Sequence, residues 1–178
     1  YYAADENGYL TQVPDNGWIL VGSYYYYAEN GAIVVSGIRK INGAYYAFDY
    51  DGKMCTDGEY IIDSTTCRAR ADGSLYVSQW YQGVDGKWYY YDENANSVDC
   101  GKAKINGVTY LFDSTRAMKT NGVIWAGGIY YLADENGIWV QTPGWVLKNG
   151  CYYYVKADGS LYTGVLEDGN ARYYLNPV

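Results

Sequence analysis

Aromatic side chains are the most abundant groups in this chain that could bind a ligand. Its 178 residues include 25 tyrosines and 6 tryptophans but only 2 phenylalanines. A tyrosine ring has an apolar body and a polar tip, so this composition favours surfaces that are partly buried and partly hydrated. The face of an aromatic ring can hold a quaternary ammonium group by cation–π attraction or stack on a sugar. These residues alone do not separate the two chemistries.

The acidic residues are placed for turns rather than for catalysis. Nearly all of them belong to short segments such as DENG, DYDG and ADG, which are typical of tight turns. Histidine is absent, so the chain has no ready general base near pH 7 and no Ser–His pair. Glycoside hydrolysis needs two carboxylates that face one cleft, and exposed turns do not supply them. We therefore predict that the chain is not an enzyme. The turn acids are Asp5, Glu6, Glu29, Asp51, Asp72, Asp92, Glu93, Asp134, Glu135 and Asp158.

Charge and cysteine content exclude several other classes of function. The formal net charge is −7 and no dense Lys/Arg cluster exists, which argues against nucleic acid or an anionic membrane as a partner. No run of about 18 apolar residues is present, so we expect no membrane insertion. The four cysteines form no CxxC pair, so we predict neither a metal site nor a cofactor. A Cys55–Cys67 disulfide and free buried thiols both remain open, as do the states of Cys100 and Cys151.

The chain repeats itself. Residues 1–8 read YYAADENG and residues 130–137 read YYLADENG, which differ at one position. Alignment on the turn glycine gives an anchor residue, mostly aromatic, seven positions earlier, and these anchors recur every 21 to 23 residues. A second column, nine residues after the anchor, is mostly apolar. The anchors are Tyr1, Tyr24, Tyr45, Thr66, Trp88, Thr109, Tyr130, Tyr152 and Tyr173, and the second column is Leu10, Ile33, Met54, Leu75, Ser97, Met118, Trp139 and Leu161.

Each repeat reads as one β-hairpin. A strand such as YYYY (24–27) or WYYY (88–91) leads into a turn such as AENG or DENG and then into a short second strand. A single hairpin is only marginally stable in water, so the hairpins must stack on one another. The predicted fold is all-β, a solenoid of tandem ~21-residue β-hairpin repeats. We expect residues 1–178 to form a single array of about eight to nine units that begins and ends inside units, as an excerpt of a longer protein.

Four segments resemble the cell-wall-binding, or choline-binding, repeats of Gram-positive surface proteins. They are GIRKINGAYYAFDYDGKMCTDG (37–58), QWYQGVDGKWYYYDENANS (79–97), INGVTYLFDSTRAMKTNG (105–122) and GWVLKNGCYYYVKADGSLYTG (144–164). The same superfamily includes the glucan-binding repeats of glucosyltransferases and the C-terminal repeats of clostridial toxins. The resemblance covers essentially the whole chain and implies a hairpin solenoid with shallow sites between neighbouring hairpins.

In the choline-binding branch of this family, each site is an aromatic cage. Its walls are the Trp of a GW dipeptide, the first aromatic of the WYY strand and an aromatic of the next repeat. The resemblance implies three such sets here. They are Trp80 and Trp88 with Tyr110, Trp18 and Tyr24 with Tyr45 or Tyr46, and Trp145 and Tyr152 with Tyr173 or Tyr174. Ile38, Glu59, Lys102 and Val123 stand where the GW tryptophan would be, so most other units read as structural spacers. Trp125 and Trp139 lie outside the cage columns, and we expect them in the core or in an interface.

Two functions follow from this reading. In the first, the array is a non-catalytic binding module of a secreted protein. It would hold its parent at the cell surface or cell wall, on the choline of teichoic acid or on a glucan or host glycan. In the second, it is a structural stalk or an adhesin segment whose ligand sites have decayed. Pairing of two arrays into a homodimer is left open.

Overall fold

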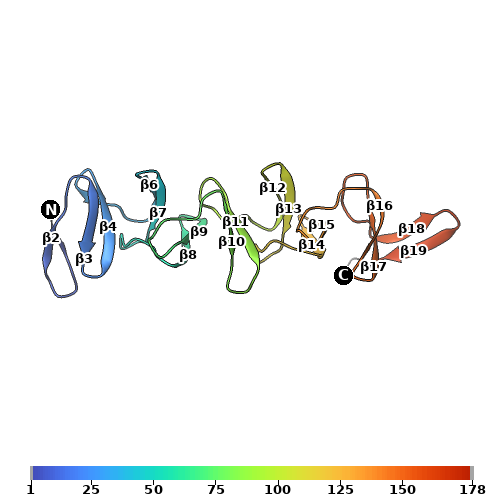
Figure 1. The fold of residues 1–178 in the computed structure, drawn as a ribbon, viewed down its shortest axis with the longest axis horizontal. Helices are drawn as coiled ribbons and strands as arrows, with labels where there is room; N and C mark the ends of the chain where they lie inside the picture. Colours follow the sequence, from blue (N-terminus) through green and yellow to red (C-terminus); the bar gives the residue numbers. More distant parts are fainter. Residues whose placement is uncertain (1, 177–178) are drawn as a thin grey trace. The chain divides into compact units, whose positions relative to one another are not determined.

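The computed structural model describes residues 2–176, so Tyr1, Pro177 and Val178 of the predicted array lie outside the described residues. Those 175 positions form β-strands joined by turns and contain no helix (Figure 1). No segment of residues 2–176 is therefore a helix that could cross a membrane. The strands are β1 (Tyr2–Ala4), β2 (Leu10–Gln12), β3 (Gly17–Val21), β4 (Tyr24–Glu29), β5 (Ala32–Ile33), β6 (Gly37–Ile41), β7 (Ala44–Phe48), β8 (Gly58–Ile62), β9 (Thr65–Ala69), β10 (Gln79–Gln82), β11 (Trp88–Tyr91), β12 (Gly101–Ile105), β13 (Val108–Phe112), β14 (Gly122–Ala126), β15 (Ile129–Ala133), β16 (Gly144–Lys148), β17 (Cys151–Val155), β18 (Gly164–Asp168) and β19 (Ala171–Leu175).

Consecutive strands pair as antiparallel hairpins, which confirms the predicted all-β array of hairpin repeats. The pairing within each unit differs from the prediction, however. The main partner of the tyrosine-rich strand precedes it: β3 pairs with β4 so that Gly17 lies opposite Ala28, and β16 pairs with β17 so that Gly144 lies opposite Val155. The predicted pairing across the DENG-type turn is present but short. It is often a single bridge, such as Phe48 with Met54 or Phe112 with Met118.

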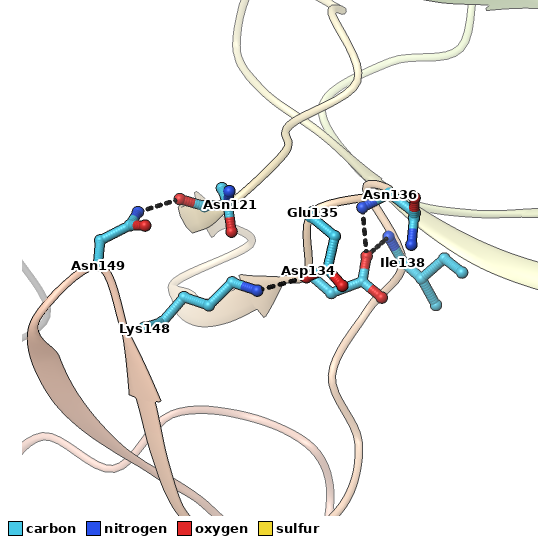
Figure 2. A network of polar contacts seen from close by, with 7 residues as sticks. All are labelled: Asn121, Asp134, Glu135, Asn136, Ile138, Lys148 and Asn149. Atoms are coloured by element: carbon cyan, nitrogen blue, oxygen red, sulfur yellow. Dashed lines mark hydrogen bonds and ion pairs between the residues drawn. The ribbon is translucent and has the colours of Figure 1, made fainter.

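The turns explain this difference. Asn42–Gly43, Asn106–Gly107 and Asn149–Gly150 have positive φ at both residues, which is the requirement of a tight two-residue hairpin turn. These Asn-Gly pairs close the long hairpins. The DENG-type turns are held instead by an aspartate. In Figure 2, the Asp134 carboxylate accepts hydrogen bonds from the backbone amides of Asn136 and Ile138, at 2.9 and 2.8 Å.

A repeated backbone hydrogen bond joins each hairpin to the next. In each case the amide of a residue in the mostly apolar column donates to the carbonyl of a strand residue in the preceding hairpin, at 2.7–2.9 Å. The strands of one hairpin thus continue to pair with the following segment, and at β13 the Leu111 amide adds a second bond, to the Gly137 carbonyl at 3.0 Å. The donor and acceptor pairs are Met54 with Tyr25, Leu75 with Tyr45, Ser97 with Thr66, Met118 with Trp88, Trp139 with Thr109, and Leu161 with Tyr130.

Side chains of the same column pack against the turn glycine of the next repeat. A Cβ added at Gly73 would lie 2.4 Å from Met54, one at Gly137 would lie 2.6 Å from Met118, and one at Gly159 would lie 2.4 Å from Trp139. All three glycines also have positive φ. The DENG-type glycine therefore serves both the turn and the packing between repeats.

The chain divides into two compact units. The first contains residues 1–81 and 90–97, and the second contains residues 82–89 and 98–178. Each unit has its own small clusters of buried residues, such as Ala47, Cys55 and Cys67 in the first and Leu132, Val155 and Leu161 in the second. The core is thus a series of local clusters that adjacent hairpins build together.

The turn glycines give a test of this packing. We expect Gly159→Ala to lower the free energy of unfolding by about 2–4 kcal/mol, because it adds a clash with the Trp139 ring to the cost of a positive φ. Gly150→Ala is the matched control. Its φ of +77° is almost the same as the +76° of Gly159, but a Cβ there would meet nothing within 4 Å, so about 1 kcal/mol is expected. Urea denaturation measures both, and equal losses would contradict the packing role.

The cysteines of the described residues are free thiols, which decides between the two alternatives for Cys55 and Cys67. Both lie buried in one cluster with Ala47 and Leu75. Burial raises the pKa of Cys55 to about 12 and that of Cys67 to about 11. Because the neutral thiols are favoured in the fold, their contribution to stability is complete below the unfolded pKa of about 8.5. It is lost as the pH rises toward the folded values.

Thiol labelling at pH 8 checks this arrangement. Cys100 and Cys151 are exposed and should react within seconds to minutes, whereas Cys55 and Cys67 should react only on unfolding. Between pH 8 and 10.5, stability should fall less steeply in the Cys55→Ala/Cys67→Ala variant than in the parent. A Cys151→Ala variant should retain the parental slope. Rapid labelling of all four thiols in the folded protein would contradict the buried cluster.

Candidate ligand sites between hairpins

The clearest aromatic cluster surrounds Trp145 in the second unit. Trp145 follows Gly144 at the start of β16 and lies opposite Tyr154 of β17, with 5.4 Å between the ring centroids. Tyr152 lies on the same face, at 6.5 Å. The next hairpin contributes Tyr173 of β19, whose ring centroid is 4.9 Å from that of Trp145. The structure thus brings together the predicted set of Trp145, Tyr152 and Tyr173.

These rings border a cavity of about 530 Å³. Tyr174 and Leu175 of β19 also line it. The Trp145 indole N–H donates a 2.7 Å hydrogen bond to the Asp168 carboxylate, which fixes the orientation of the ring and places a negative charge at its edge. An aromatic cavity beside a carboxylate has the electrostatic character that suits a cation.

The alternation of side chains between the two faces of a strand explains why these side chains meet. Successive strand residues point to opposite faces, so Trp145 shares its face with Leu147 and with the cross-strand residues Tyr152 and Tyr154. Val146 and Tyr153 lie on the other face and pack against the cluster of Leu132, Val155 and Leu161. One face of the hairpin therefore supplies the core, and the other supplies the site.

Trp18 forms a similar cluster in the first unit. Its ring centroid lies 5.2 Å from that of Tyr27 across the hairpin and 4.9 Å from that of Tyr46 in the next hairpin. Phe48 adds a contact at 6.0 Å. Of the two residues proposed to close this set, Tyr46 is therefore the one that meets Trp18. Tyr45 instead lies under the Lys40 ammonium, at 5.3 Å.

The predicted role of Tyr24 requires a correction. Tyr24 lies opposite Val21, on the other face of the hairpin from Trp18, and its ring is covered by the Lys53 ammonium at 4.7 Å. Tyr25 occupies the position that Tyr152 has in the last cluster, and its carbonyl accepts the bond between hairpins. The error arises because the turn at Glu29–Gly31 is one residue shorter than its equivalents, so alignment on the turn glycine shifts the anchor by one residue.

The third predicted set falls across the two units. Trp80 belongs to the first unit and packs against Tyr90 with 5.1 Å between ring centroids, which matches the Trp18–Tyr27 and Trp145–Tyr154 pairs. Trp88 and Tyr110 belong to the second unit. Their association with Trp80 remains a prediction.

Aliphatic residues fill the equivalent position in two other hairpins. Ile38 follows Gly37 and packs against the cluster that contains Cys67 of the next hairpin. Val123 follows Gly122 and packs against the cluster that Tyr153 also contacts. These two junctions are closed by apolar packing, as expected for structural spacers.

A lysine fills the same position in a third hairpin. Lys102 follows Gly101, and its ammonium lies 4.4 Å from the centroid of the Tyr131 ring and 4.2 Å from that of Trp139. Tyr131 lies opposite Ile124, just as Tyr173 lies opposite Leu166, so it is the equivalent of the third cage wall. This junction keeps aromatic rings in place and holds a cation that belongs to the chain itself.

The acidic side chains of the turns are engaged by backbone amides. Asp113 illustrates the pattern: burial alone would raise its pKa, but the hydrogen bonds from the Thr115 hydroxyl and amide keep the pKa below its ordinary value. The Ser160 hydroxyl lowers the pKa of Asp158 in the same way. Such carboxylates stay ionised at neutral pH and stabilise turns, in agreement with the interpretation drawn from their sequence positions.

Trp139 and Trp125 were both expected in the core or in an interface, and the structure separates them. Trp139 is partly buried and its indole N–H donates to the Gly159 carbonyl at 2.9 Å, as expected of a packing residue. Trp125 is 55% exposed. It is therefore not a core residue, and its place in an interface stays a prediction. Trp125 lies third after Gly122 on β14, near the exposed Gly127–Gly128 turn.

Comparison with known proteins identifies the repeat to which these residues are similar. Residues 144–161, which contain Trp145 and Tyr152, match the model of the cell wall binding repeat. Glucosyltransferase-I of Streptococcus downei is 30% identical over 161 residues, which cover 85% of this chain and 10% of that protein. The chain spans about a tenth of the length of the curated relatives it matches.

Solved structures agree with this assignment. CbpJ of Streptococcus pneumoniae is 26% identical and has a TM-score of 0.64, with 99% of this chain and 60% of that chain covered. Choline binding protein F of the same organism is 26% identical with a TM-score of 0.63, covering 96% of this chain and 57% of the other. The array of β-hairpins, the Gly-Trp junctions at Trp18 and Trp145 and these matches together show that the chain belongs to the cell wall binding repeat family.

Proposed function

We propose that the chain is a non-catalytic module that holds its parent protein on a polymer of the cell wall through aromatic sites between consecutive hairpins. The observation that carries this proposal is the cavity bordered by Trp145, Tyr152 and Tyr173, whose Trp145 indole N–H is hydrogen-bonded to the Asp168 carboxylate. Its ligand would be a quaternary ammonium group, as in the choline of teichoic acid. The cluster of Trp18, Tyr27 and Tyr46 would be a second site.

The expected affinity of each site is low. A cation gains about 0.5–2 kcal/mol from each ring, so three rings supply roughly 2–5 kcal/mol. That range corresponds to a millimolar dissociation constant. Several weak sites on one chain can still retain a protein on a repetitive polymer, because the second contact forms at high effective concentration. This use of weak sites fits a module that anchors rather than one that captures free ligand.

The names of the relatives support two ligand classes. Choline binding protein F supports a quaternary ammonium, and the glucosyltransferases support a glucan. The Asp168 carboxylate favours the cation at the Trp145 site. A module of this kind would act outside the cell, in contact with the wall. Its engaged turn carboxylates support a non-catalytic role, and any catalytic domain would lie elsewhere in the parent protein.

A second function, that of a structural stalk, is favoured by the closed junctions. Ile38, Val123 and Lys102 occupy the position of the cage tryptophan and pack against the next hairpin. We propose that these junctions hold the spacing of the array, while the Trp junctions bind. The two functions then belong to different hairpins of one chain.

A choline titration followed by tryptophan fluorescence tests the binding function. The parent chain should give a saturable change in the millimolar range, and Trp145→Ala should weaken binding at its site at least tenfold, because it removes the central wall. Tyr50→Ala is a control, since Tyr50 is 78% exposed in a turn and outside these clusters. A flat titration to tens of millimolar would rule out choline sites, and the stalk would then be favoured if glucans also fail to bind.

Replacement of Lys102 tests whether it occupies a ligand position. Lys102→Ala should cost about 0.5–1 kcal/mol of stability, because it removes the ammonium from the Tyr131 and Trp139 rings. Choline at 50 mM should then raise the melting temperature of Lys102→Ala more than that of the parent, because the small side chain leaves room for a cation that replaces the lost ammonium. Lys104→Ala, on the same strand, should show the parental response. Equal stabilisation of all three proteins would contradict the idea.

A further inference from the structure

The second unit contains another cavity, of about 490 Å³, whose lining includes none of the tryptophans of the three predicted cages. It is formed by residues of the β14–β15 hairpin, of the segment 156–164 and of the β18–β19 hairpin. Its aromatic lining is Trp125, Tyr130 and Tyr174, and its polar lining includes Lys156 and Thr163. Trp125 lies outside residues 144–161, the segment that matches the cell wall binding repeat.

Two features fix the walls of this cavity. The Trp125 ring packs against the Tyr130 ring with 4.4 Å between centroids and 52° between planes, although 55% of Trp125 is exposed. The Leu161 amide donates to the Tyr130 carbonyl at 2.8 Å, and this bond holds segment 156–164 beside the ring. The cavity is thus built on the same hydrogen bond that joins the hairpins, and the exposed indole contacts the Tyr130 ring.

The chemistry of the lining favours a saccharide over a cation. An exposed indole is a stacking surface for a sugar ring. The Thr163 hydroxyl and the Lys156 ammonium supply hydrogen bonds for sugar hydroxyls, and no carboxylate of residues 2–176 lines the cavity. Lys156 would repel a quaternary ammonium. The Trp145 cavity has the opposite character, because the Trp145 indole N–H is hydrogen-bonded to the Asp168 carboxylate.

The two cavities adjoin one another. Tyr174 and Leu175 line both of them, and Tyr174 is 78% exposed. We propose that the Trp125 cavity is a saccharide subsite, which takes a neutral sugar ring of the same wall polymer whose cationic group enters the Trp145 cavity. This inference rests on the proposed binding function, and it adds a second ligand chemistry on the adjacent surface.

Indole N–H signals in NMR spectra of the ¹⁵N-labelled full chain allow the two cavities to be read separately. The probes are isomaltopentaose, a neutral α-glucan oligosaccharide, triacetylchitotriose as an N-acetylated sugar, and choline chloride. Trp125→Ala and Trp145→Ala assign the two signals by their loss. We expect at least one oligosaccharide to shift the Trp125 signal with a millimolar midpoint, and choline to shift the Trp145 signal.

The variants decide the outcome. Trp125→Ala should weaken oligosaccharide binding at least tenfold and leave the choline response of Trp145 intact. Lys156→Gln should weaken oligosaccharide binding about threefold. Lys104→Gln is the matched charge control and should leave oligosaccharide binding unchanged. A Trp125 signal that neither sugar shifts, or a response that survives Trp125→Ala, would overturn the subsite. A missing choline response at Trp145 would count against the proposed cation site alone.

Discussion

The backbone hydrogen bond that recurs between one hairpin and the one before is the interaction on which the rest of the structure depends. Each bond contributes only about 1 kcal/mol, but it recurs from Met54–Tyr25 to Leu161–Tyr130 with nearly constant geometry. It sets the register in which an apolar side chain reaches the turn glycine of the next repeat, as Trp139 reaches Gly159. A hairpin that is marginal alone is thereby stabilised by both of its neighbours.

The ligand sites follow from that register. Because the bond fixes one hairpin against the next, the residue after the first strand glycine faces the equivalent residue of the following hairpin at three junctions. Trp18 meets Tyr46, Trp145 meets Tyr173, and Lys102 meets Tyr131. An aromatic residue at that position leaves rings with exposed faces, an aliphatic residue closes the junction, and a lysine supplies its own cation. The binding capacity of each junction thus depends largely on one side chain.

The period of the sequence was sufficient to predict the hairpin array, because turn glycines and tyrosines recur in most units. The family resemblance suggested the set of Trp145, Tyr152 and Tyr173, whose rings the structure brings together. The period failed where a turn changed length. The short turn at Glu29–Gly31 moved the anchor from Tyr25 to Tyr24, on the wrong face of the strand. The hairpin turns were predicted at the DENG segments, but the Asn-Gly pairs close the longer hairpins. Trp125 could not be placed, because its exposure depends on hairpins that are distant in the sequence.

The donor and acceptor of the joining hydrogen bond are both main-chain atoms, which has a consequence for how such arrays change. Duplication of about 21 residues supplies a complete new donor and acceptor, whatever side chains it carries. Units can therefore be gained or lost without redesign of their neighbours, and each copy is free to drift afterwards. An array of this kind can vary the number and kind of its binding sites by unequal recombination, while the fold common to it and CbpJ persists at 26% identity.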